Sequence, residues 1–201
     1  TNVVQKELVK NAFISLILAI IGIIIYVSFR FSFSYAVGGI LALAWDAFFI
    51  IALFSILKLE VSSIFIAAIL SIIGYSINDT IVTFDRVREN INKLYKGNLE
   101  TKNDLKNVIN LSLSQTLLRS LITTITTLIP VICLVLFGSG EIFNFNVALL
   151  FGLVSGVYSS IFIATQILYF LESKNIGKPK KKKWYEEDDE VHEKKVKGIN
   201  C

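Results

Sequence analysis

The chain has 201 residues, of which 54% are hydrophobic, with a mean hydropathy of +0.64 and a formal net charge of +4. A soluble protein of this length cannot hide so much uncharged surface in one core, because the buried fraction is limited by domain size. The composition therefore excludes a soluble globular domain and predicts an integral membrane protein.

Long segments almost free of charge recur along the chain, and an apolar stretch of about 20 residues is enough to cross a bilayer as a helix. The pattern predicts an all-α transmembrane domain over residues 11–171. Its five helices are expected at residues 11–29, 33–56, 61–84, 116–138 and 145–171. Small side chains suit close helix packing in membranes, and the last helix carries a stripe of them at Gly152, Ser155, Gly156, Ser159 and Ser160.

Three polar segments flank or join these helices: a flank at 1–10, a loop at 85–115 and a charged tail at 172–201. An odd number of spans places the two ends on opposite sides. Most lysines and arginines lie in the loop and the tail, so the positive-inside rule puts both in the cytoplasm and the flank outside. Because the chain opens at Thr1 without methionine, we expect a preceding span or domain and interpret it as part of a longer polypeptide.

Polar side chains recur at four-residue spacing in the third and fourth helices. They are Ser71, Tyr75, Asp79 and Thr83 in the third, and Arg119, Thr123 and Thr127 in the fourth. Lipid cannot satisfy such groups, so both stripes are expected to face protein or an internal cavity. Asp79 and Arg119 fall at similar depth in the cytoplasmic half, and the spacing permits an ion pair between them.

Asp79 is the strongest functional candidate. A carboxylate inside a membrane costs about 2.5–3.5 kcal/mol on insertion scales and is rarely kept without a use. The alternative is structural: Arg119 would extend to the interface, and Asp79 would only hydrogen-bond its neighbours. The capacity of a buried carboxylate to change charge favours proton coupling. For Asp46, in the middle of the second helix, we favour a packing or hydrogen-bonding role over transport.

Enzymatic functions have little support in the sequence. The only histidine, His192, lies in the tail, so no histidine-based metal site or catalytic triad is expected in the membrane. No GxxxxGK[ST] phosphate loop is present, and the residues before Asp79 lack the Gly-x-Gly-Asp context of aspartyl intramembrane proteases. We therefore expect no enzyme, metal or cofactor. The basic run at 178–185 suits contact with anionic lipid or ribosomal RNA, but we favour a disordered, solvated topology signal over both and expect no nucleic-acid partner.

Three segments carry a resemblance to a known family. Ile73–Asn90, with Ile-Gly-Tyr-Ser-Ile-Asn-Asp-Thr-Ile-Val at its start, resembles the signature of SecF, a family of bacterial protein-export membrane components. Ser114–Thr124 resembles a second signature. Gly39–Leu43 followed by Asp46 resembles a third, with Trp45 where the family usually has histidine. The order of the three segments also matches, and the resemblance covers roughly residues 5–172.

The resemblance implies a chain that follows a large extracytoplasmic domain and is organised like half of a resistance-nodulation-division transporter. It implies SecD, the SecYEG–SecA translocon and a translocating preprotein as partners in the bacterial cytoplasmic membrane, with the proton-motive force promoting export. Proton coupling would fall to Asp79 and Arg119. The supporting polar residues would be Tyr75, Asn78, Thr83, Thr123 and Asp46. The loop 85–115 is a few residues longer than the family suggests. The alternatives are a small-molecule exporter of the resistance-nodulation-division type and a non-transporting membrane scaffold.

Overall fold

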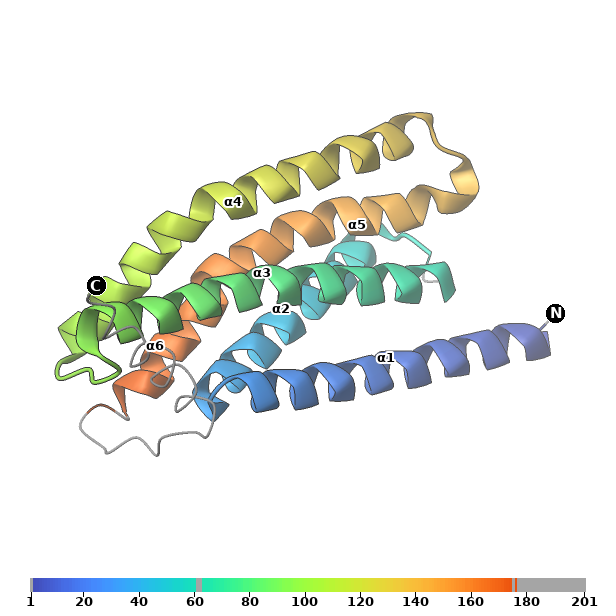
Figure 1. Ribbon diagram of the computed structural model, residues 1–201. Coiled ribbons are helices and arrows are strands. Elements are labelled where there is room, and N and C mark those ends of the chain that lie inside the picture. Colours follow the sequence, from blue (N-terminus) through green and yellow to red (C-terminus); the bar gives the residue numbers. More distant parts are fainter. Residues whose placement is uncertain (1, 61–62, 175, 177–201) are drawn as a thin grey trace, which may run out of the picture.

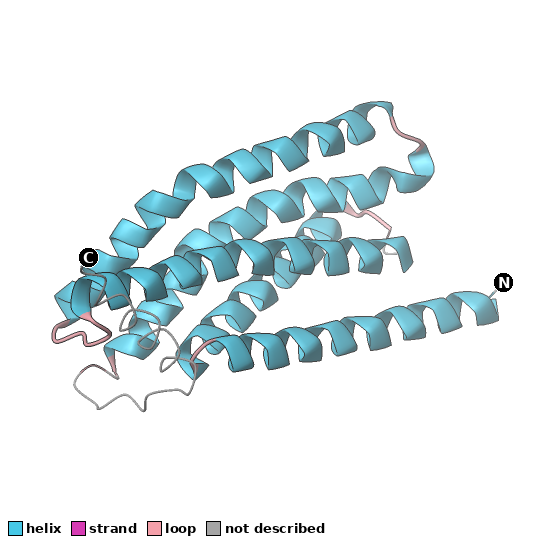
Figure 2. Cartoon of the chain, in the orientation of Figure 1, coloured by secondary structure: helices cyan, strands magenta, loops and turns pink. Residues whose placement is uncertain are grey.

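The computed structural model describes residues 2–60, 63–174 and 176, and within these residues it contains helices and no strands. The helices run alternately up and down an elongated bundle (Figure 1, Figure 2). They are α1 (Asn2–Arg30), α2 (Phe33–Leu57), α3 (Ser63–Tyr95), α4 (Lys102–Phe137), α5 (Gly140–Tyr158), the π-helix η1 (Ser159–Ala164) and α6 (Thr165–Ser173). The last three elements follow without a break and form one long helix.

The helices have the length and composition of membrane spans. Four are long and apolar enough to cross a bilayer: Phe33–Leu57, Ile64–Tyr95, Lys102–Phe137 and Gly140–Ser173. Within the residues searched, the apolar part of α1 is Ile14–Arg30. The predicted all-helical membrane bundle is confirmed, and the protein is a multi-pass membrane protein. α1 begins at one end of the bundle and α6 ends at the other (Figure 1).

The segment 85–115, predicted as a loop, is helical for most of its length. α3 continues to Tyr95 and α4 begins at Lys102, so only residues 96–101 join the two helices. The predicted spans end where the polar segment 85–115 begins and resume where it stops, but a helix does not have to end where its apolar part ends. These polar extensions keep one apolar face, which is buried at Val87, Ile91, Leu105, Val108 and Ile109.

The ends of the helices show two further features. A capping box begins α4: the Thr101 hydroxyl accepts from the Asp104 N–H at 3.2 Å, and the Asp104 carboxylate accepts from the Thr101 N–H at 3.0 Å. α1 begins at Asn2, so the predicted flank 1–10 is helical over its described residues. Most of the predicted tail, from residue 177 onward, lies outside the described residues.

α3 occupies the centre of the bundle and contacts α1, α2, α4 and α5. Two glycines bring α5 close to it. Gly152 lies against the side chain of Ile72 and Gly156 lies against Ser76, so a Cβ at either position would press on α3. The consequence is that the middle of the last long helix reaches both α3 and α2.

Candidate functional site

Asp79 lies at the middle of α3, with its side chain half-buried. Its Oδ1 accepts a hydrogen bond from the hydroxyl of Ser120 on α4. Its Oδ2 is buried and has no hydrogen-bond partner within the described part of the chain. A carboxylate oxygen has lone pairs for further bonds, so Asp79 can take a proton on Oδ2 while the Ser120 contact stays in place.

Arg119 does not form an ion pair with Asp79. The salt bridges between described residues do not include either side chain, and Arg119 is exposed. Successive positions on an α-helix point about 100° apart, so Ser120 contacts Asp79 directly while the neighbouring Arg119 acts on it electrostatically without an ion pair. Asn78 and Thr123, two of the predicted supporting residues, are exposed as well.

Other hydroxyls continue the polar contact between α3 and α4. The Tyr75 hydroxyl lies 3.2 Å from Oγ1 of Thr124, one helical turn from Asp79. Thr124 in turn donates to the backbone carbonyl of Ser120 at 2.8 Å. Thr83, one turn further along α3, is buried. The seam between α3 and α4 thus places Asp79 among neutral hydroxyl groups.

Asp46 is the most deeply buried carboxylate of the described chain, with a side chain that is 0% exposed. Three serine hydroxyls donate to it. Ser76 on α3 reaches Oδ2 at 2.6 Å, Ser155 on α5 reaches Oδ1 at 2.8 Å, and Ser159 at the start of η1 reaches Oδ2 at 2.8 Å. Asp46 therefore ties α2 to both α3 and the last long helix.

The serines of the last long helix make contacts that the sequence does not predict. The small-residue stripe favours a packing role, but Ser155 and Ser159 also hydrogen-bond to Asp46. The neighbouring Ser160 lies 2.8 Å from the hydroxyl of Thr80. The wider turn of η1 lets two successive serines face buried polar partners, and such π-helical turns occur often at functional sites. The sequence pattern that indicates these contacts is the pair Ser155 and Ser159, four residues apart on the face of the helix that carries Gly152.

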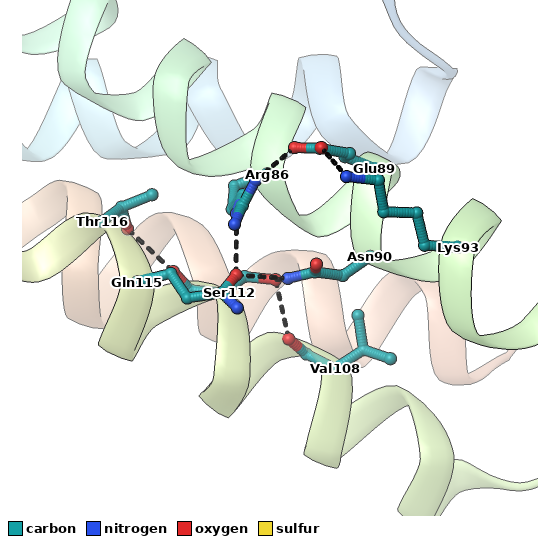
Figure 3. A network of polar contacts seen from close by, with 8 residues as sticks. All are labelled: Arg86, Glu89, Asn90, Lys93, Val108, Ser112, Gln115 and Thr116. Carbon is teal, nitrogen blue, oxygen red and sulfur yellow. Dashed lines mark hydrogen bonds and ion pairs between the residues drawn. The ribbon is translucent and has the colours of Figure 1, made fainter.

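A second group of polar contacts joins the polar extensions of α3 and α4 (Figure 3). Nε of Arg86 donates to Oε1 of Gln115 at 2.7 Å. Nδ2 of Asn90 donates to the same oxygen at 2.9 Å and to the Ser112 hydroxyl at 2.8 Å. Because Asn90 and Ser112 are buried, these bonds fix how the two helices meet a few turns from Asp79.

Ion pairs at the same end of the bundle involve more exposed groups. Glu89 binds Arg86 at 2.5 Å and Lys93 at 2.6 Å along α3, and Arg30 binds Asp85 at 3.0 Å between α1 and α3. Exposed ion pairs contribute only about 0–1 kcal/mol each. Their clearer effect is to orient Arg86 toward Gln115.

Comparison with known proteins identifies the family. The model of the family described as "Protein export membrane protein SecD/SecF, C-terminal" matches residues 1–174. The chain belongs to this family. The resemblance of the three sequence segments is thereby confirmed.

The chain is similar to several curated relatives. It is 53% identical over 164 residues to the protein translocase subunit SecDF of Bacillus subtilis, covering 82% of this chain and 22% of that protein. It is 40% identical over 168 residues to the protein translocase subunit SecF of Pseudomonas aeruginosa, covering 84% of this chain and 53% of that protein. The chain thus spans about half the length of this SecF relative and a smaller share of SecDF.

Solved structures support the same assignment. A crystal structure of SecDF in a "super-membrane-facing form" matches with a TM-score of 0.76 and 34% identity, over 93% of this chain and 23% of that chain. A crystal structure of SecDF from Thermus thermophilus, described as a translocon-associated membrane protein, matches with a TM-score of 0.74 and 38% identity, over 82% of this chain and 22% of that chain. The bundle therefore has the SecDF membrane fold.

Proposed function

We propose that this chain is the membrane part of a SecF-like subunit that uses the proton-motive force, together with SecD, to promote preprotein translocation across the bacterial cytoplasmic membrane. Family membership supports the export role. The observation that carries the proton coupling is Asp79, a carboxylate in a membrane helix with one oxygen bound by Ser120 and the other without a partner. Ionisable residues inside membranes commonly mark proton relays.

In this mechanism a proton binds Oδ2 of Asp79, forms an O–H bond and removes the negative charge. The Ser120 contact to Oδ1 holds the carboxyl group in both states. The change of charge alters the attraction between Asp79 and Arg119, and the resulting shift of α3 against α4 passes to the extracytoplasmic domain. One elementary charge that crosses 100 mV of membrane potential supplies about 2.3 kcal/mol, which is enough to bias two helix arrangements.

The distribution of basic residues supports the orientation that we propose. Arg30 lies in the last turn of α1 and Lys93 in the last turn of α3, at the same end of the bundle as α6 (Figure 1). The positive-inside rule assigns this end to the cytoplasm, so the first residues of the chain lie outside. The partners in this proposal are SecD, the SecYEG–SecA translocon, the preprotein and membrane lipid, with no nucleic acid.

Translocation of a preprotein into proteoliposomes tests the proposal. The full-length subunit is reconstituted with SecD and SecYEG–SecA, with and without a proton gradient, as wild type, Asp79→Asn and Arg119→Ala. We expect both variants to assemble and to lose the gradient-dependent part of translocation. Thr126→Ala is the matched control, because Thr126 is exposed on α4 and, among the described residues, its hydroxyl bonds only to carbonyls of its own helix.

Two other results would identify the alternative functions. Unchanged translocation together with a loss of thermal stability in Asp79→Asn would mean that the carboxylate only holds helices together, as in a scaffold. Gradient-driven efflux of a small molecule that is independent of SecYEG would indicate an exporter of the resistance-nodulation-division type.

A further inference from the structure

Asp46 is a carboxyl group in the core of the bundle without a basic residue beside it. Its side chain is fully buried, and the ion pairs of the described chain do not include it. An ionised carboxylate in such surroundings is costly unless it is paired, fully hydrogen-bonded or protonated. Among the described residues, its hydrogen bonds come only from neutral serine hydroxyls.

The elements packed against α2 are α1, α3, α5, η1 and α6, and within the described residues no titratable side chain of these elements hydrogen-bonds or forms an ion pair with Asp46. In the described part of the chain, Tyr75, Asp79 and Glu172 hydrogen-bond to Thr124, Ser120 and Ser32, respectively. The exposed groups of α1 and α5 include Tyr26, Arg30, Glu141 and Tyr158. η1 carries no titratable residue, and on α2 only Tyr35 is titratable besides Asp46. The charge state of Asp46 is therefore set by its own proton and its serines.

The distances around Asp46 suit the exchange of a proton with this site. The three hydroxyl oxygens lie 2.6–2.8 Å from the carboxylate oxygens, which is the length of direct O–H···O bonds. Within the described residues no further carboxylate, histidine or cysteine joins Asp46 to form a ligand set for a metal ion. A proton can bind Asp46 without moving the oxygen atoms of the site.

The hydroxyl groups can serve both states of the carboxyl. Ser159 donates to Asp46, and its oxygen also lies 3.1 Å from the carbonyl oxygen of Gly156. When Asp46 is protonated, the Ser159 hydrogen can turn to that carbonyl, and the Ser159 oxygen then accepts the new carboxyl O–H. A hydroxyl is both donor and acceptor and rotates freely, so neither state leaves a buried group without a partner.

We propose that Asp46 is a second proton-binding site of this membrane bundle, separate from Asp79 and built from the hydroxyls of Ser76, Ser155 and Ser159. A hydrated proton binds Oδ2 of Asp46 and forms an O–H bond, so the side chain changes from a charge of −1 to neutral. Release of the proton breaks this bond and restores the charge. The use of this proton in export rests on the proposed function, whereas its binding does not depend on export and is measured separately.

Infrared difference spectroscopy during a pH titration tests the proposal, because a protonated carboxyl and a carboxylate absorb at different frequencies. The full-length subunit with SecD is held in liposomes as wild type, Asp46→Asn and Asp79→Asn. We expect a carboxyl band that grows on acidification, is lost in Asp46→Asn and persists in Asp79→Asn. Absence of any band specific to Asp46 across the stable pH range would overturn the proposal, because Asp46 would then keep one charge state.

Two neighbouring serines provide variants that keep the carboxyl itself. Ser159→Ala removes a hydrogen bond to Asp46 in both states, but the bond to the charged carboxylate is the stronger one, so the midpoint of the Asp46 band should move to higher pH by about one unit. Ser160→Ala is the matched control, because Ser160 contacts Thr80 and not Asp46, and its midpoint should stay in place. Equal midpoints in both variants, or a band that follows sodium concentration at constant pH, would also contradict the proposal.

The infrared titration and the translocation assay together separate the proposed proton site at Asp46 from the proposed role of Asp79 in export. An Asp46 band together with unimpaired export in Asp79→Asn supports the second site and contradicts the proposed role of Asp79. If export depends on the gradient and on Asp79 but no Asp46 band appears, the role of Asp79 is supported and the second site is contradicted. The serines around Asp46 then form only a structural anchor.

Discussion

Ser120 binds Asp79 through a neutral hydroxyl, and the identity of this partner matters for the carboxylate. A guanidinium in direct contact would favour the ionised form throughout a transport cycle. A hydroxyl can donate to the carboxylate and can also accept from the carboxylic acid. The contact seen between α3 and α4 therefore suits a group that changes its charge, while Arg119 remains exposed beside it.

Ser120→Ala removes the only hydrogen-bond donor that Asp79 has among the described residues. We expect the free energy of unfolding to fall by about 1–3 kcal/mol, the usual cost of a buried polar atom without a partner, and gradient-dependent translocation to fall with it. Equilibrium unfolding in detergent measures the first effect, with Thr126→Ala as the control. Equal stability of the two variants would mean that the Ser120 contact contributes nothing.

At the scale of helices, the close approach of α5 to α3 places serines around Asp46. This approach depends on Gly152, which faces the fully buried side chain of Ile72. Ile72 is β-branched and has little freedom to move away in a packed core. The glycine thus determines where Ser155 lies, one turn further along the same helix.

Gly152→Ala should separate α5 from α3 and lower the free energy of unfolding by about 1–3 kcal/mol, as overpacking in a core usually does. Gly74→Ala is the matched control, because a Cβ at Gly74 in α3 meets no atom within 4 Å. Thermal unfolding of both purified variants measures the effect. A Gly152→Ala protein as stable as Gly74→Ala would show that α5 can shift at no cost.

The polar extension of α4 depends on its first turn. Thr101→Ala removes the hydroxyl that accepts from the N–H of Asp104, and loss of an N-cap typically costs about 1 kcal/mol. We expect faster hydrogen–deuterium exchange at the first turn of α4 and unchanged exchange around Thr124, in the middle of the helix. Uniform acceleration along α4 would contradict a local role for the cap.

At the scale of the whole molecule, the helical bundle follows from the sequence because long uncharged segments have few alternatives to a membrane span. Asp79 is also a candidate from the sequence alone, since a carboxylate in such a segment stands out by its cost; its role stays a prediction. The helical extensions beyond the membrane were missed because charges at 85–95 and 102–115 marked the end of the apolar segments and not the end of the helices.

The partners of the two carboxylates could not be read from spacing alone. Ser120 and Arg119 are adjacent, and only the rotation of α4 about its axis decides which of them faces Asp79. The π-helical turn at Ser159 likewise depends on packing against α2 and α3, because no local sequence rule in the segment requires it. Helix rotation and local unwinding are tertiary effects, which a pattern along one chain does not contain.

Proton flux is the most direct test of the central claim that Asp79 couples proton movement to export. The full-length subunit with SecD is reconstituted in vesicles that contain a pH-sensitive dye, a proton gradient is imposed, and flux is recorded during preprotein translocation. The account predicts flux in the wild type and in Thr126→Ala, and none above the empty-vesicle rate in Asp79→Asn. Wild-type flux in a correctly assembled Asp79→Asn protein would contradict it.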